Sequence, residues 1–185
     1  MEAKFFKKIE NSTQEGFTLI ELMLVVTLLA VSIGVTNDIL MSLVRGNNKT
    51  QVMNEIEQQS NFVSSKIERE LRGARSVSTP ESGQSGENLV FESKDGVIIE
   101  YNLDSASGIL RRRVGTSGPF TPITSNNNPG GVVVAGPTGA PFSVSGYNPQ
   151  IVNINLMFSQ AQPGVSSSYT GETTIQSTIV VRNTY

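Results

Sequence analysis

The sequence predicts an α+β fold in which a long N-terminal helix, first transmembrane and then amphipathic, packs on a C-terminal antiparallel β-sheet. An apolar run at residues 17–36 is followed by a single apolar stripe at helical spacing. From residue 76 the pattern changes to short alternating segments that are separated by Gly- and Asn-rich turns. With 185 residues, the chain suits one modest domain plus an anchor.

The apolar run has the length and composition of a membrane span. Twenty residues, 17–36, would extend about 30 Å as a helix, which is enough to cross a hydrocarbon core. Glu21 is the only ionisable side chain within them. Three lysines precede the run and no cationic cluster follows it at once, so the positive-inside rule places the N-terminus in the cytoplasm. We therefore expect a single-pass protein of the cytoplasmic membrane.

A general secretory signal peptide is the alternative interpretation of this run. Its apolar core would be residues 22–29, and Ala30-Val31-Ser32 would supply a small-x-small cleavage site. The apolar character continues beyond that site to residue 36, however, and Glu21 lies where such a signal is uniformly apolar. Both features favour a retained helix.

Residues 37–75 are expected to continue the helix as an amphipathic segment. Their apolar residues are spaced 4, 7, 4, 4 and 3 apart and form one stripe, which we expect to pack in the core. The stripe consists of Val52, Ile56, Val63, Ile67, Leu71 and Ala74. A helix from Phe17 to about Arg75 would be roughly 88 Å long. Low helix propensity at Gly34, at 37–38 and at 46–48 would permit bending or local melting.

Residues 76–185 are expected to form an extracytoplasmic β-rich domain. A meander of three antiparallel strands is predicted first, with a turn at 104–108. Residues 115–150 hold six of the eight prolines and are interpreted as a surface excursion that contains one strand. The predicted strands are 87–93, 96–103, 109–114, 131–136, 150–159 and 171–183.

The composition argues against several classes of function. The chain has no Cys and no His, which removes disulfides, the commonest general base and the commonest transition-metal ligand. A net charge of -2 argues against nucleic acid as a main partner, and Arg111-Arg112-Arg113 is interpreted as a solvated strand edge that blocks sheet aggregation. No phosphate loop, GxSxG or metal-spaced cluster is present. We expect a non-enzyme with no catalytic residue, metal or cofactor.

The segment "EGFTLIELMLVVTLLA", residues 15–30, closely resembles the class III signal and N-terminal helix of type IV pilins and type II secretion pseudopilins. The resemblance implies that prepilin peptidase cuts between Gly16 and Phe17 and then methylates the new amino group of Phe17. Residues 1–16 would be a cytoplasmic leader, and residues 17–36 would remain as a transmembrane and assembly helix. The implied partners are prepilin peptidase, membrane lipid before assembly, and other pilin or pseudopilin subunits.

Glu21 is then expected to serve subunit assembly. A carboxylate in a bilayer is costly unless it is paired, and the amine created at Phe17 lies one turn away, about 6 Å along the axis. The amine could belong to the same chain. In the family it is taken to belong to the neighbouring subunit, which would set the axial stagger of the helices. Snorkelling of Glu21 to the cytoplasmic interface is a third interpretation.

Beyond the N-terminus, the chain looks like the J-type minor pseudopilins and the W-type minor pilins. The resemblance rests on "KIERELRGA" (66–74), the hairpin at 98–113, "FTPITSN" (120–126) and "TIVVRN" (178–183). Asn37-Asp38 stands where major pilins often have Pro, and the Cys pair of many major pilins is missing. The resemblance therefore implies a minor subunit, in an initiating or tip complex of a pilus or pseudopilus. The alternative is a stand-alone, membrane-anchored β-domain that acts as an adhesin.

Overall fold

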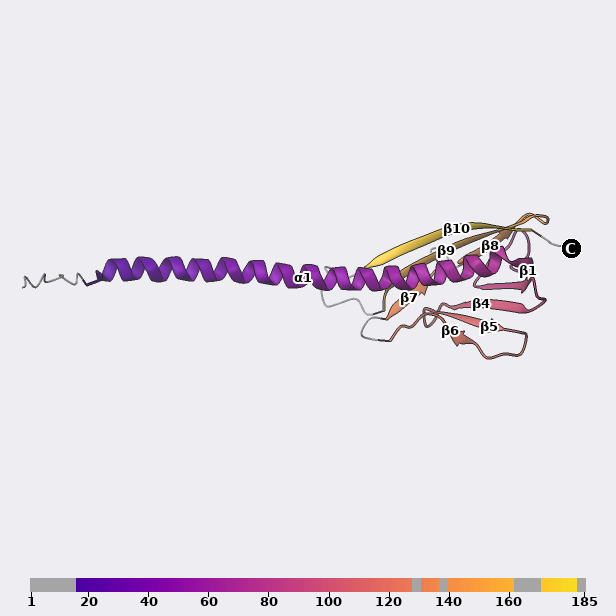
Figure 1. Ribbon diagram of the computed structural model, residues 1–185, viewed down its shortest axis with the longest axis horizontal. Helices are drawn as coiled ribbons and strands as arrows, with labels where there is room; N and C mark the ends of the chain where they lie inside the picture. Colours follow the sequence, from indigo (N-terminus) through magenta and orange to yellow (C-terminus); the bar gives the residue numbers. More distant parts are fainter. Residues whose placement is uncertain (1–15, 128–130, 137–139, 162–170, 183–185) are drawn as a thin grey trace, which may run out of the picture. The chain divides into compact units, whose positions relative to one another are not determined.

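The computed structural model describes residues 16–127, 131–136, 140–161 and 171–182 (Figure 1). Contacts divide the chain into two compact units, Met1–Leu43 and Val44–Tyr185. One helix, α1 (Leu19–Arg72), and a set of antiparallel strands make up the described fold. The predicted α+β class is confirmed.

Helix α1 runs for 54 residues without a break, so the positions of low helix propensity within it are helical. It ends at Arg72 rather than near Arg75, because Gly73 closes the last turn and its carbonyl accepts a 3.0 Å hydrogen bond from the Lys94 amide. Ala74, which was expected to be the last residue of the helical stripe, is instead the first residue of strand β1 (Ala74–Thr79). Its side chain is still buried.

In the first unit, the helix exposes apolar side chains on every side. All residues from Leu19 to Leu43 are exposed. By length and composition α1 contains a segment able to cross a membrane, and no residue of that segment is buried by the described chain. This surface must be covered by lipid or by other helices, because apolar area of this extent is not stable in water.

Five strands form the first sheet, in the order β1-β3-β4-β5-β6. The predicted meander is confirmed as β3 (Asn88–Ser93), β4 (Ile98–Asp104) and β5 (Ile109–Val114). The sequence analysis missed β1 and the two-residue β6 (Thr121–Pro122). Strand β1 has no simple alternation, because its pairing with β3 shifts register between Ala74 and Ser76 and again between Val77 and Thr79.

A second sheet has the order β10-β9-β8-β2, and β7 also pairs with β9. Its long strands, β9 (Gln150–Gln160) and β10 (Glu172–Val181), agree with the prediction. The expectation of one strand within 115–150 is wrong, since that stretch holds β6, β7 (Val132–Ala135) and β8 (Phe142–Ser145). Strand β2 (Ser85–Gly86) pairs with β8.

The second half of α1 packs in the core of the second unit. Ile56, Val63, Ile67 and Leu71 are at most 1% exposed and belong to one core cluster with inward residues of both sheets. Ser60 fills the seven-residue gap in the apolar stripe; it is 3% exposed, and its hydroxyl donates a 3.0 Å hydrogen bond to the Glu57 carbonyl. The apolar stripe that the sequence predicts therefore packs in the core, as expected.

The turn between β4 and β5 also joins the two sheets. Gly108 has a positive φ of 65°, its carbonyl accepts a 2.8 Å hydrogen bond from the Val134 amide, and a Cβ atom there would collide with the side chain of Val133 on β7. Only glycine satisfies both the backbone conformation and the close approach.

Gly108→Ala should therefore lower the free energy of unfolding by about 2–3 kcal/mol, measured by urea denaturation of the full chain in detergent. Gly96→Ala is the matched control, because Gly96 also has a positive φ (77°) in a turn of the same sheet but its Cβ would have no neighbour closer than 3.7 Å. Equal losses in the two variants would show that the contact with Val133 is unimportant.

Candidate functional site

The N-terminus of α1 is closed by a reciprocal pair of side chains. Thr18 precedes the first helical residue, and its hydroxyl accepts a 3.3 Å hydrogen bond from the amide of Glu21. The Oε2 atom of Glu21 accepts a 3.4 Å hydrogen bond from the amide of Thr18 and another of 3.4 Å from its hydroxyl. This is a capping box, in which two backbone donors of the helix end are satisfied. The Thr-x-x-Glu spacing at 18–21 is its sequence signature, which the sequence analysis overlooked.

The predicted cleavage site lies immediately before this cap. Gly16 and Phe17 are exposed and precede the helix, and the Phe17 side chain is 82% exposed. The scissile bond expected between them is therefore not enclosed by the described part of the chain. Their cleavage and methylation remain predictions.

The capping box places Glu21 next to the point where the predicted amine would form. Oε2 is held by Thr18, the residue that directly follows Phe17. Among the described residues, Oε1 accepts no hydrogen bond. One carboxylate oxygen is thus committed to the cap, while the other is available to a cation from the same chain or from a neighbour.

A second polar cluster joins the last turns of α1 to the first sheet. Glu70 accepts a 2.7 Å hydrogen bond from the hydroxyl of Tyr101 on β4 and a 3.1 Å hydrogen bond from Nε of Arg112 on β5. Nη2 of Arg112 lies 3.0 Å from the second oxygen of Glu70. Burial of Tyr101, together with its hydrogen bond to Glu70, raises the pKa of the phenol above its ordinary value of 10.

Glu68, two residues earlier, joins the same helix to the second sheet. Its Oε1 accepts a 2.8 Å hydrogen bond from the hydroxyl of Ser177 on β10 and one of 3.2 Å from Ser64. Since Glu70 binds the first sheet, the run at 66–74 uses its two glutamates to hold α1 against both sheets. The i,i+4 spacing of these glutamates with basic residues also gives two ion pairs along the helix, Lys66–Glu70 at 3.8 Å and Glu68–Arg72 at 3.7 Å.

The arginine run on β5 is not a solvated sheet edge. Strand β5 lies between β4 and β6, and each arginine pairs with a carboxylate. Arg111 pairs with Asp104 at 2.7 Å, Arg112 with Glu70, and Arg113 with Glu100. The interpretation as an edge that blocks aggregation is wrong, because β5 is not an edge strand and its arginines form ion pairs with β4 and with α1.

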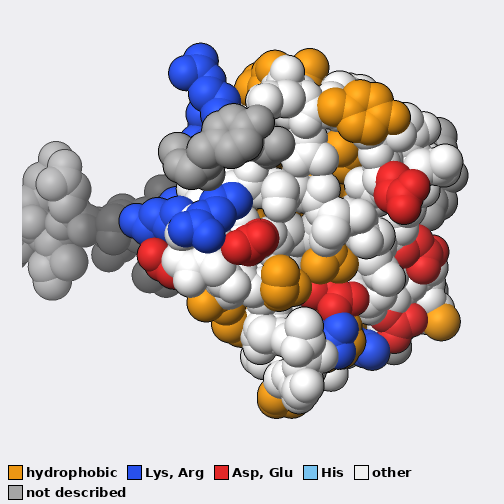
Figure 2. Space-filling view, turned by 90° about the vertical axis from the view of Figure 1, so that its right-hand side faces the viewer, with side chains coloured by type: hydrophobic (Ala, Val, Ile, Leu, Met, Phe, Trp, Pro, Cys, Tyr) orange, Lys and Arg blue, Asp and Glu red, His pale blue; other side chains and the backbone are white. Residues whose placement is uncertain are grey.

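Near the end of α1 there is a cavity of about 810 Å³ whose lining includes four basic residues. They are Arg72, Arg75, Lys94 and Arg182, contributed by α1, β1, the β3–β4 turn and the end of β10. Figure 2 looks toward this end of the second unit and shows Lys and Arg side chains on the left of the face and, separately, at its lower edge, with acidic side chains close to them. Within the described ranges, no group of three or more His, Cys, Asp or Glu residues could hold a metal ion.

Comparison with known proteins gives one match. Residues 11–36 match the model of a family described as the prokaryotic N-terminal methylation motif. The match includes Gly16, Phe17 and Glu21, and it supports a pilin-like N-terminal segment of the kind that prepilin peptidase processes. No curated protein and no solved structure matches the chain significantly.

The buried phenol predicts a specific loss of stability at alkaline pH. Because the pKa of Tyr101 is higher in the folded chain, the unfolded chain releases this proton at lower pH. The contribution of Tyr101 to the free energy of unfolding is therefore fully present below pH 10 and is lost as the pH rises above 10. The contribution of one such group is at most about 1.4 kcal/mol per pH unit. Tyr101→Phe should have lower stability at pH 8, by about 1 kcal/mol, but a shallower decline between pH 10 and 11.

Urea unfolding of the full chain in detergent at a series of pH values measures this slope. Tyr147→Phe is the control, because the Tyr147 side chain is 81% exposed. If Tyr101→Phe and the wild type decline in parallel while Tyr147→Phe also follows the wild type, the buried phenol does not control the alkaline transition.

Proposed function

We propose that this protein is a minor pilin or pseudopilin, a non-enzymatic structural subunit of a type IV pilus or of a type II secretion-like pseudopilus. Prepilin peptidase would remove residues 1–16 and methylate Phe17. The helix would hold the subunit in the cytoplasmic membrane, with the β-rich unit outside the cytoplasm, until it is extracted into the filament. Its place would be in the initiating or tip complex.

The observation that carries the proposal is the methylation motif at 11–36 on a helix with an uncovered apolar surface. A secretory signal would be discarded after cleavage, whereas cleavage after Gly16 would retain the whole apolar segment of α1. In a filament, this surface would pass from lipid to contact with other apolar helices. The transfer loses little hydrophobic free energy, because both environments exclude water.

Glu21 would guide docking through its charge. Capping of the helix within a single chain accounts for an acceptor at position 21, but Gln would satisfy the capping box equally well. Capping therefore does not explain why the side chain is charged. A full negative charge next to an apolar surface is costly without a cation. The amine of Phe17, made by cleavage, would supply that cation, and pairing between chains would also fix the stagger of neighbouring helices.

A minor role is favoured over that of a major fibre subunit. The chain has no Cys to staple a C-terminal loop, and Asn37-Asp38 stands within an unbroken helix. The run at 66–74, which resembles the corresponding run of the J-type and W-type proteins, has a defined structural role here. Its two glutamates bind the two sheets, so the resemblance extends to residues that hold the domain together.

Three substitutions separate the charge of Glu21 from its capping role. Glu21→Gln keeps an acceptor for the Thr18 amide and loses the charge, Glu21→Ala loses both, and Thr18→Ala keeps the charge and loses the hydroxyl of the cap. In a host with the assembly machinery, the amount of each variant in sheared filaments is compared with its amount in the membrane.

We expect Glu21→Gln and Glu21→Ala to lose incorporation about tenfold or more, since an unpaired amine would cost more than 1.4 kcal/mol per docked subunit. Thr18→Ala should lose much less, because a cap contributes about 1 kcal/mol. Leader removal, followed by gel mobility, should be normal in all three. Normal incorporation of Glu21→Gln would contradict the pairing role, and absence of the wild type from filaments would contradict the proposed function.

A further inference from the structure

Among the described strands, β10 is the longest one that forms the edge of a sheet. It has ten residues and pairs only with β9, without a shift in register. From Thr173 to Val181 it contains no charged residue and no proline. The side of β10 that is not paired with β9, its free edge, therefore presents a regular row of backbone donors and acceptors to any other strand.

The other edges of the two sheets, as far as the structure describes them, are protected. Strand β1 shifts register twice, and the carboxamide of Gln150 accepts a 2.8 Å hydrogen bond from the Val77 amide and donates one of 2.9 Å to the Val77 carbonyl. Strands β2 and β6 have two residues each, and β6 contains Pro122. The amide of Val134 on β7 donates a hydrogen bond to the Gly108 carbonyl. Irregular, short, proline-containing or covered edges resist pairing with another chain, and β10 has none of these features.

The backbone groups at the free edge follow from the bonds between β10 and β9. The amide of Gln160 on β9 donates a 3.3 Å hydrogen bond to the carbonyl of Gly171, which directly precedes β10. Successive residues of an antiparallel strand direct their backbone groups to alternate sides, so the odd-numbered residues of β10 bond to β9. The even-numbered residues from 172 to 180 therefore direct their amides and carbonyls to the free edge.

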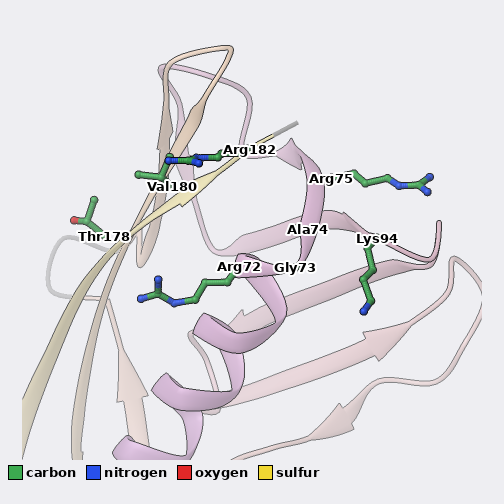
Figure 3. A pocket seen from close by; sticks show the side chains of 8 residues that line it. All are labelled: Arg72, Gly73, Ala74, Arg75, Lys94, Thr178, Val180 and Arg182. Carbon is green, nitrogen blue, oxygen red and sulfur yellow. The ribbon is translucent and has the colours of Figure 1, made fainter. Parts of the chain in front are cut away.

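Open space borders the last part of this edge. The cavity of about 810 Å³ near the end of α1 is lined on the β10 side by Thr178, Val180 and Arg182, all of which have even numbers. Its other wall includes Ala74 and Arg75 on β1, and Figure 3 shows the two groups on separate strands. The Val180 side chain is 48% exposed, so this part of β10 is accessible to another chain.

The two ends of β10 carry opposite charges. Glu172 is the first residue of the strand; it is exposed and has no ion-pair partner within the described ranges. Arg182 directly follows the last residue and is also exposed. The even positions between them hold only Thr, Gln and Val. This edge is complementary to a strand with the reverse order of charges, and a second β10 in antiparallel orientation has that order.

We propose that two copies of this chain pair through the free edges of β10, as antiparallel strands centred on Ser177. In this register Glu172 of each copy lies opposite Arg182 of the other. Even-numbered residues also lie opposite even-numbered residues, so the outward amides and carbonyls of both copies meet, as a hydrogen-bonded antiparallel pair requires. The contact is isologous, because the same residues of both copies form it.

The ion pair does not require Arg182 to be free of other contacts. Arg182 also has an interaction within its own chain. Its guanidinium carries five N–H donors, so it can bind a carboxylate of a second copy as well.

The pairing fixes the relative direction of the two chains. Gly171 lies beside Met53 of α1, since an added Cβ would come within 2.7 Å of the Met53 sulfur, and Ser177 bonds to Glu68. Strand β10 and this part of α1 therefore run in the same direction, and the two helix segments run in opposite directions in the pair. Such a contact suits subunits of two different filaments, because neighbours within one filament would have parallel helices. This setting rests on the proposed function, whereas the pairing itself does not.

The chain has no cysteine, so a single introduced thiol tests the register. Ser177→Cys places two thiols at the centre of the pair, at a position where Cα atoms are about 4.5 Å apart and a disulfide can form. Thr173→Cys is the matched control, because Thr173 is also partly buried on the same face of β10 but lies about 27 Å from its own copy in this register. The full chain in detergent is oxidised with copper phenanthroline over a range of concentrations, and covalent dimers are quantified on gels.

A second pair of variants leaves the bond between Ser177 and Glu68 intact. Thr174 of one copy lies opposite Val180 of the other, and both side chains are exposed. An equimolar mixture of Thr174→Cys and Val180→Cys chains should therefore form disulfide dimers. Either variant alone should not, because its two thiols would be about 20 Å apart.

Charge reversal tests the ion pairs. In the Ser177→Cys background, Glu172→Arg or Arg182→Glu alone should weaken dimer formation about tenfold, because each change replaces two attractive contacts by repulsive ones. The double variant Glu172→Arg, Arg182→Glu should restore dimer formation, since both members of each ion pair are reversed. Glu81→Arg, which reverses an exposed carboxylate outside β10, should have no effect.

The inference is supported if the paired thiols link, the control thiols do not, and the double reversal restores what the single reversals lose. It is overturned if neither Ser177→Cys nor the mixture links, if Thr173→Cys links equally well, or if the double reversal does not restore a lost dimer. A monomeric chain in these tests leaves the proposed function standing. Absence of the wild type from filaments would instead contradict the proposed function and leave the pairing intact.

Discussion

The apolar surface of α1, with one carboxylate at its start, is the constraint on which the whole account depends. The described chain covers none of this surface between Leu19 and Leu43. Lipid and neighbouring helices both satisfy it, but neither satisfies the charge of Glu21. A cation at a defined position beside the helix start would satisfy that charge, and cleavage between Gly16 and Phe17 would create one there. Cleavage would thus provide the charge that pairs with the carboxylate at the start of the uncovered helix.

In the second unit, by contrast, the chain itself covers the apolar residues of this helix. There its apolar stripe is buried, and polar contacts from Glu68 and Glu70 hold it against both sheets. Partly buried carboxylates are costly unless each oxygen is satisfied, and Glu70 meets this condition through Tyr101 and Arg112. Any pull exerted on the helix would therefore be opposed by contacts with two sheets rather than with one.

Patterns within single segments made part of this structure predictable. The helix followed from its period, the meander followed from alternation, and the core role of Val63 and Ile67 followed from their spacing. The capping box was also readable, because Thr18 and Glu21 have the required separation. Strands β1, β6 and β8 were missed because they are short or bulged and rich in Ser, Thr, Arg and Pro, so their conformation depends on the strands they pair with.

The polar clusters could not be predicted from the sequence, because their members lie far apart along the chain. Arg112 meets Glu70 across 42 positions of sequence, and Gln150 meets Val77 across 73. Nothing in the local pattern distinguishes these pairs from ordinary surface residues. The basic cavity likewise gathers one side chain each from α1, β1, the β3–β4 turn and the end of β10, and only the fold brings them together.

The central claim is that the chain is cut after Gly16 and that its apolar helix is retained with a new charge at Phe17. Intact-mass and N-terminal peptide spectrometry of the protein purified from the membrane of a host with its prepilin peptidase measures this directly. The account predicts a chain that begins at N-methylated Phe17 and contains Glu21. A chain that begins at Met1, or after Ser32, would contradict it.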